Sequence, residues 1–96
     1  MERDDILDAL RGHLTEIRGF GVIHLALFGS LARGEGRADS DVDILVEFSQ
    51  PVGLFAFVRL QRYLEEILGR SVDLVTPGAI RPEMREAILS EAVYAA

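Results

Sequence analysis

Residues 27–46 read LFGSLARGEGRADSDVDILV. This stretch begins as an apolar run, breaks at a Gly-Ser pair and passes through a polar loop with two further glycines. It then enters a second apolar run that carries Asp41 and Asp43, one residue apart. The order predicts two buried strands joined by a loop, and the most reactive side chains of the chain lie in and around that loop.

The segments on either side of this stretch predict alternating helices and strands. Strands are expected over three short apolar runs, namely Val22–Phe28, Val42–Phe48 and Val72–Val75. Helices are expected along the apolar stripe from Ile6 to Ile17, which Asp4 and Asp5 precede, over a short turn at Leu31–Arg33 capped by Ser30, over Leu54–Leu68 before Gly69, and from Pro82 onward. We therefore predict an α/β fold, a small three-stranded mixed sheet flanked by about four helices, in one domain over residues 1–96.

Apolar spacing predicts which side of each element is buried. On the helix over residues 54–68 the expected buried side includes Leu54, Leu60 and Leu64. On the last helix the expected apolar face is made by Met84, Ile88, Leu89 and Ala92. In the second strand, Asp41 and Asp43 share one face with Leu45, because alternate residues of a strand point to the same side.

Composition excludes several classes of protein. The net charge is −6, and all ten basic residues are arginine, so an acidic chain of this kind repels nucleic-acid backbones. There is no cysteine, which excludes disulfides and thiolate metal sites. No apolar run approaches the roughly 20 residues of a membrane span, and the first residues do not resemble a signal peptide. A cytoplasmic location is expected.

The two aspartates of the second strand indicate a cation site. On one face of a strand their Cα atoms lie about 6.5–7 Å apart. Two unit charges about 4 Å apart repel by about 4 kcal/mol at an effective dielectric constant of 20. Oxygen ligands of this kind suit Mg²⁺, which usually takes one or two carboxylates together with substrate phosphates.

Two further features extend that site. Asp73 opens the third strand, so a parallel second and third strand would bring Asp41, Asp43 and Asp73 to one end of the sheet, the arrangement of two-metal phosphoryl transfer. The Gly29-Ser30 turn offers free N–H groups and a hydroxyl to an anion. A phosphate held there would lie near the carboxylates only if the first two strands are antiparallel.

Other known loops fit the sequence poorly. A calcium loop would need glycine at Ile44 and glutamate at Gln50, and a P-loop would need a lysine that the chain lacks. The dinucleotide fingerprint would need glycine at Asp39. A plain turn with solvated aspartates stays open as an alternative, as does a solvated or capping role for Asp73.

At this point the residues resemble a known family. Gly29-Ser30, ten intervening residues, Asp41-Val42-Asp43 and the later Val72-Asp73-Leu74 are similar to the minimal nucleotidyltransferases of the polymerase-β-like superfamily. Within it, the chain most resembles the MNT-domain antitoxins that are paired with HEPN-domain toxins. The resemblance spans nearly the whole chain and implies the polymerase-β-like nucleotidyltransferase core as the fold.

The resemblance also implies roles for individual residues. Asp41, Asp43 and Asp73 would be catalytic and bind two Mg²⁺ ions, with Asp73 orienting or deprotonating the attacking hydroxyl. The nucleotide-binding residues would be Gly29 and Ser30, which hold the terminal phosphates of ATP, and Arg33.

The implied protein is the antitoxin of a type VII-like HEPN/MNT pair. It would transfer AMP from ATP to a tyrosine of its cognate HEPN toxin and form a hetero-oligomer with it, without binding nucleic acid directly or entering a membrane. Two alternatives stay open: an antitoxin that acts by binding alone, and the nucleotide-binding subunit of a two-chain small-molecule nucleotidyltransferase.

Overall fold

The computed structural model describes residues 2–96 and contains four strands, five α-helices and one short 3-10 helix among them. The helices are α1 (Arg3–Gly12), α2 (Leu14–Gly19), α3 (Gly29–Ala32), α4 (Leu54–Leu68), α5 (Pro82–Glu91) and the 3-10 helix η1 (Pro77–Ala79). The strands are β1 (Val22–Phe28), β2 (Val42–Phe48), β3 (Val72–Val75) and β4 (Val93–Tyr94). None of the helices in the described part of the chain is long and apolar enough to cross a membrane.

The strands form one mixed sheet in the order β3-β2-β1-β4. Strand β1 is antiparallel to both β2 and β4, whereas β2 and β3 are parallel and α4 connects them. The sheet is therefore mixed, as predicted, and both pairings are the ones that the predicted site required. The predicted number of strands was too low, because β4 is only two residues long and shows no alternation that a sequence pattern could reveal.

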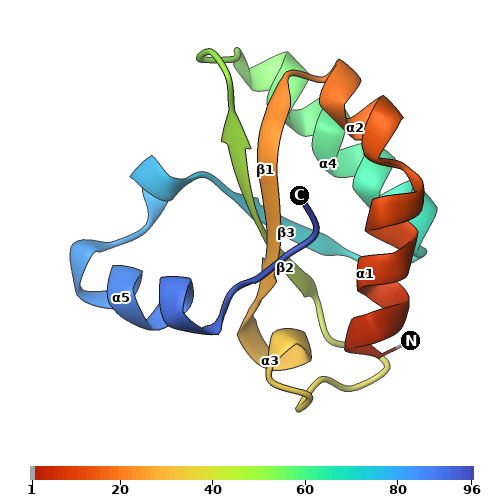
Figure 1. Cartoon of the computed structure of the whole chain (residues 1–96), viewed down its shortest axis with the longest axis vertical. Helices are drawn as coiled ribbons and strands as arrows, with labels where there is room; N and C mark the ends of the chain where they lie inside the picture. The colour runs from red at the N-terminus through yellow and green to blue at the C-terminus, as the bar shows by residue number, and fades with distance from the viewer. Residues whose placement is uncertain (1) are drawn as a thin grey trace.

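The two faces of the sheet are covered unequally. Figure 1 shows α1, α2 and α4 together on one side of the sheet and α5 on the other. The larger core lies under the three helices, where Leu10, Ile44 and Leu60 are fully buried. A smaller cluster of Ala26, Leu45 and Ile80 lies on the α5 side. Each large side chain buried in this way stabilises the fold by about 1.5–3 kcal/mol.

Strand β2 shows the predicted alternation. Val42, Ile44 and Val46 pack in the larger core, whereas Leu45 packs in the smaller cluster on the opposite face. Asp43 lies between Val42 and Ile44 and is half-buried. It therefore points to the α5 side of the sheet, the face that fewer helices cover.

Three predictions about the helices were wrong in detail. The first helix is broken into α1 and α2 at His13, which follows Gly12, a poor helix former. Leu54 is 74% exposed, because the apolar stripe of α4 meets the core only from its second turn. Met84 and Leu89 on α5 are also exposed, at 50% and 46%, so that helix buries no side chain fully.

Candidate active site

Asp43 and Asp73 lie side by side on neighbouring parallel strands. They are paired in the register of β2 and β3, and neighbouring strands are about 4.8 Å apart. Phe28, the last residue of β1, pairs with Asp43 on the other side. The end of β1, which leads into Gly29, therefore meets both aspartates at one end of the sheet, as the predicted topology required.

Gly29 packs directly against the carboxylate of Asp43. Its φ is +77°, in the left-handed region that glycine adopts without strain. A Cβ atom at this position would overlap Oδ2 of Asp43 and lie 3.0 Å from its Cγ. Gly29 is thus needed both for the direction of the turn and for the room that the Asp43 side chain occupies.

The electrostatics of Asp43 differ from those of an exposed aspartate. The pKa of its carboxyl is raised from 3.8 to about 6, mainly by burial and also by the nearby negative charges of Asp73 and Asp41. Arg33 acts in the opposite sense and lowers it. The site therefore carries an excess of negative charge that a cation would relieve.

Asp41 lies next to this pair but outside the strand. It is the residue before β2 and is exposed. Within residues 2–96, no three His, Cys, Asp or Glu side chains are arranged to hold a metal ion by themselves. The donors present nonetheless fit Mg²⁺, which commonly takes one or two carboxylates and completes its shell with waters and phosphate oxygens.

The turn after β1 differs from the predicted cap. Helix α3 already begins at Gly29 with Phe28 as its N-cap, so Ser30 lies inside the first turn and does not cap it. The carbonyl of Ser30 accepts a hydrogen bond from the N–H of Glu35, at 2.8 Å. Its hydroxyl makes no hydrogen bond to other residues in the range 2–96, so it can still bind a ligand.

Arg33 follows α3 and contacts two carboxylates. Its Nη1 lies 2.8 Å from Oε2 of Glu91, and its Nε lies 3.3 Å from Oε2 of Glu35. The hydrogen bond from Arg33 lowers the pKa of Glu91, so that carboxyl is ionised at neutral pH. Oε1 of Glu91 also accepts a hydrogen bond from the N–H of Gly29, at 3.0 Å.

Two residues that contact the site, Glu91 and Arg70, were not predicted from the sequence. The Nη2 of Arg70 donates hydrogen bonds of 2.6 Å to the carbonyls of Arg37 and Ser40. These bonds hold the loop that leads into Asp41. Arg70 directly follows the glycine that ends α4, which was the available signal for a residue placed near the start of β3.

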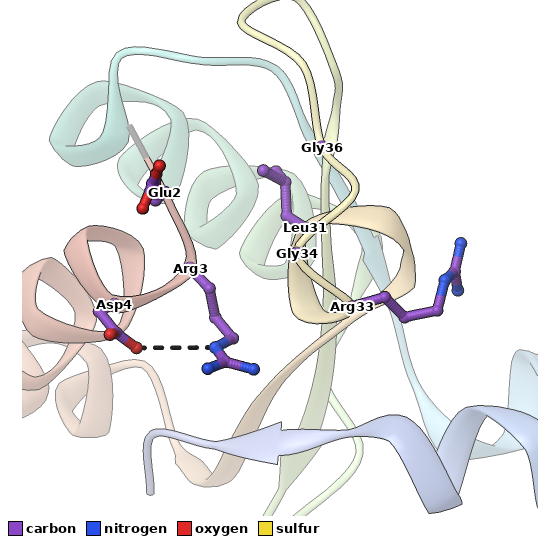
Figure 2. A pocket seen from close by; sticks show the side chains of 7 residues that line it. All are labelled: Glu2, Arg3, Asp4, Leu31, Arg33, Gly34 and Gly36. Carbon is purple, nitrogen blue, oxygen red and sulfur yellow. Dashed lines mark ion pairs between the residues drawn. The ribbon is translucent and has the colours of Figure 1, made fainter.

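A cavity of about 340 Å³ opens on another side of α3. Figure 2 shows Glu2, Arg3 and Asp4 around it, with the Arg33 side chain directed away from them. Arg3 forms an ion pair of 3.6 Å with Asp4 there. Arg33 is among its lining residues, but neither Asp43 nor Asp73 lines it, so the cavity does not include the acidic site.

Comparison with known families gives a match over most of the chain. The family model described as a nucleotidyltransferase domain matches residues 7–95. The protein adenylyltransferase MntA of Thermococcus cleftensis is 42% identical over 92 residues, which cover 95% of this chain and 93% of that protein.

Solved structures show the same fold. A structure described as a minimal nucleotidyltransferase has a TM-score of 0.84 and 36% identity, and the match covers 97% of this chain and 95% of that one. A toxin–antitoxin complex with AMP-PNP gives 0.71 at 22% identity, covering 100% and 73% of the two chains. The complex of a tri-AMPylated HEPN toxin of Shewanella oneidensis with its MNT antitoxin gives 0.67 at 18% identity, covering 94% and 71%.

Proposed function

This chain belongs to the nucleotidyltransferase domain family, and on that premise we propose that it transfers AMP from ATP to a hydroxyl group of a partner protein. The observation that carries the proposal is the pairing of Asp43 with Asp73 directly beside the Gly29 turn. It places two carboxylates and the Gly29 turn together at one end of the sheet. The MntA relative, a protein adenylyltransferase, supports the same reaction.

In this proposal each site residue has a defined role. Asp41, Asp43 and Asp73 would hold Mg²⁺ together with water and phosphate oxygens, and the ion would neutralise charge on the phosphates. The backbone of Gly29, the hydroxyl of Ser30 and the guanidinium of Arg33 contact the phosphates of ATP. The proposed site therefore consists of Gly29, Ser30, Arg33, Asp41, Asp43 and Asp73.

The reaction is an in-line displacement at the α-phosphorus. The acceptor oxygen forms a bond to the α-phosphorus. The bond between the α-phosphorus and the oxygen that bridges it to the β-phosphate breaks, so that pyrophosphate leaves. The proton of the acceptor hydroxyl passes to Asp73 or to water. The site residues act mainly by positioning the reactants and stabilising charge, through the carboxylates and through the hydrogen-bond donors that contact the phosphates. This is usual for phosphoryl transfer.

We further propose the acceptor and the partner. The acceptor is a tyrosine of a cognate HEPN toxin. Residues 1–96 form one minimal nucleotidyltransferase domain, which acts as the antitoxin of a type VII-like pair in the cytoplasm. The solved complex of an AMPylated HEPN toxin with an MNT antitoxin supports this, since its antitoxin fold is shared.

The decisive test uses the protein encoded next to this chain. Incubation of the two proteins with Mg²⁺ and ATP labelled at the α-phosphate should label the partner, and mass spectrometry should locate AMP on tyrosine. Asp43→Asn serves as the inactive control. Neutralisation of the partner without label would favour the binding-only alternative, and label on a small molecule instead would favour the two-chain transferase.

A further inference from the structure

Glu91 joins two parts of the site that lie far apart in the sequence. It is the last residue of α5, and its carboxylate contacts both Gly29 and Arg33 across the start and the end of α3. The side chain is 22% exposed, so both contacts are partly shielded from water. The function proposed above assigns no role to this residue.

The contacts of Glu91 continue to Asp43 through the glycine turn. Glu91 holds the N–H of Gly29 from one side, and the carboxylate of Asp43 fills the space beside the Cα of Gly29. A shift of this turn would therefore change where the Asp43 carboxylate can lie. Both Glu91 and Arg33 also act electrostatically on Asp43, in opposite directions.

The hydrogen bonds of Glu91 matter more because α5 is lightly packed. That helix has no fully buried residue, and only Ile88 and the adjacent Ala92 touch the small apolar cluster. A charged acceptor on a backbone N–H and a guanidinium makes the stronger class of hydrogen bond. The same contacts do not involve the Ser30 hydroxyl, so Glu91 fixes the turn and leaves that hydroxyl available to a ligand.

We propose that Glu91 is a positioning residue for nucleotide binding: it fixes the Gly29 turn against Asp43 and holds Arg33 beside the turn. The ligand class is a nucleoside triphosphate, so the inference rests on the proposed function and deepens it. In physical terms, α5 supports the Gly29 turn and Arg33 through one carboxylate.

The test compares three variants by their affinity for Mg²⁺ with a non-hydrolysable ATP analogue. Glu91→Ala removes both contacts, whereas Glu91→Gln keeps an oxygen that can accept the N–H of Gly29 but loses the charge that faces Arg33. Glu86→Gln removes the same charge from an exposed site on the same helix and is the matched control. Amide exchange of Gly29, measured by NMR, reports the contact directly.

We expect Glu91→Ala to expose the Gly29 amide to exchange and to weaken nucleotide binding about tenfold or more, the factor for one lost charge-assisted hydrogen bond. Glu91→Gln should lie between Glu91→Ala and wild type, and Glu86→Gln should match wild type. In turnover with the partner protein, the loss should appear in KM for ATP more than in kcat. If Glu91→Ala melts too low to study, the intermediate rank of Glu91→Gln decides the matter.

Unchanged or tighter binding in Glu91→Ala would overturn the inference, because tighter binding would mean that the carboxylate competes with phosphate. Weaker binding in that variant, together with no AMP transfer by the wild type, would sustain the positioning role and refute the proposed transfer. Absence of nucleotide binding by the wild type would refute both.

Discussion

Replacing Asp43 by asparagine should stabilise the metal-free protein at alkaline pH. Burial and the charges of Asp73 and Asp41 raise the pKa of Asp43 to about 6 in the folded state. The folded state therefore binds this proton more tightly than the unfolded state does, and its stability falls as pH rises from about 4 to about 6. Above that window the full cost of the buried charge is present, and asparagine removes it.

The size of the effect follows from the shift. A rise of about two units in the pKa of Asp43 on folding corresponds to about 3 kcal/mol in the free energy of unfolding. Because Asp43 is only half-buried, solvent screens part of this, and we expect about 1–2 kcal/mol. For a domain of this length that raises the melting temperature by roughly 5–10 °C.

Thermal melts in a chelator, at about pH 8 and about pH 4, measure the difference. The advantage of Asp43→Asn should be large at the higher pH and mostly gone at the lower one, where the wild-type carboxyl is protonated. Mg²⁺ should raise the melting temperature of the wild type and leave that of Asp43→Asn nearly unchanged. Asp39→Asn, in the exposed loop, is the control. An equal or lower melting temperature for Asp43→Asn at about pH 8 would refute the reasoning.

Two other substitutions test the geometry of the site. Gly29→Ala should destabilise the fold by about 1–2 kcal/mol, because its backbone is left-handed, and should reduce AMP transfer about a hundredfold by displacing Asp43. Gly53→Ala, at an open position with φ of −75°, should do neither. Thermal melts and transfer assays distinguish the two variants, and full activity of Gly29→Ala would contradict the close packing. Arg70→Lys should lower kcat several-fold while changing stability by less than about 1 kcal/mol, because the shorter lysine side chain lacks the planar guanidinium that directs its donors at both carbonyls of the loop before Asp41. Wild-type turnover of this variant would show that the loop needs no such contact.

The sequence pattern predicts most of the backbone for a simple physical reason. Strands β1, β2 and β3 and helix α4 begin and end at the predicted residues, because each is a dense apolar run closed by glycine, proline or a polar turn. The break at His13 was not predictable in this way, since Leu10 and Ile17 on either side continue one apolar stripe. Strand β4 is held by backbone pairing to Ala26 and Leu27, which side-chain patterns do not record.

The candidate site was also predictable only in part, for the same physical reason. Two-residue alternation and the crossover through α4 suffice to predict that Asp43 and Asp73 lie side by side. The contact of Glu91 with Gly29 spans 62 positions and depends on how α5 docks. That docking is weakly encoded, because Met84 and Leu89 of the predicted apolar face remain exposed. Long-range polar contacts of lightly packed helices are therefore the part that local patterns omit.

The absent side chain at position 29 also has an evolutionary consequence. A glycine codon becomes an alanine codon by one base change, and the added methyl group would reach only the Asp43 carboxylate among its near neighbours. The exposed apolar side chains of Leu54 and Phe55 on α4 would be untouched. A lineage of such proteins can thus lose its chemistry in one mutational step while the rest of its surface stays the same. The same step gives the experimenter a separation-of-function allele.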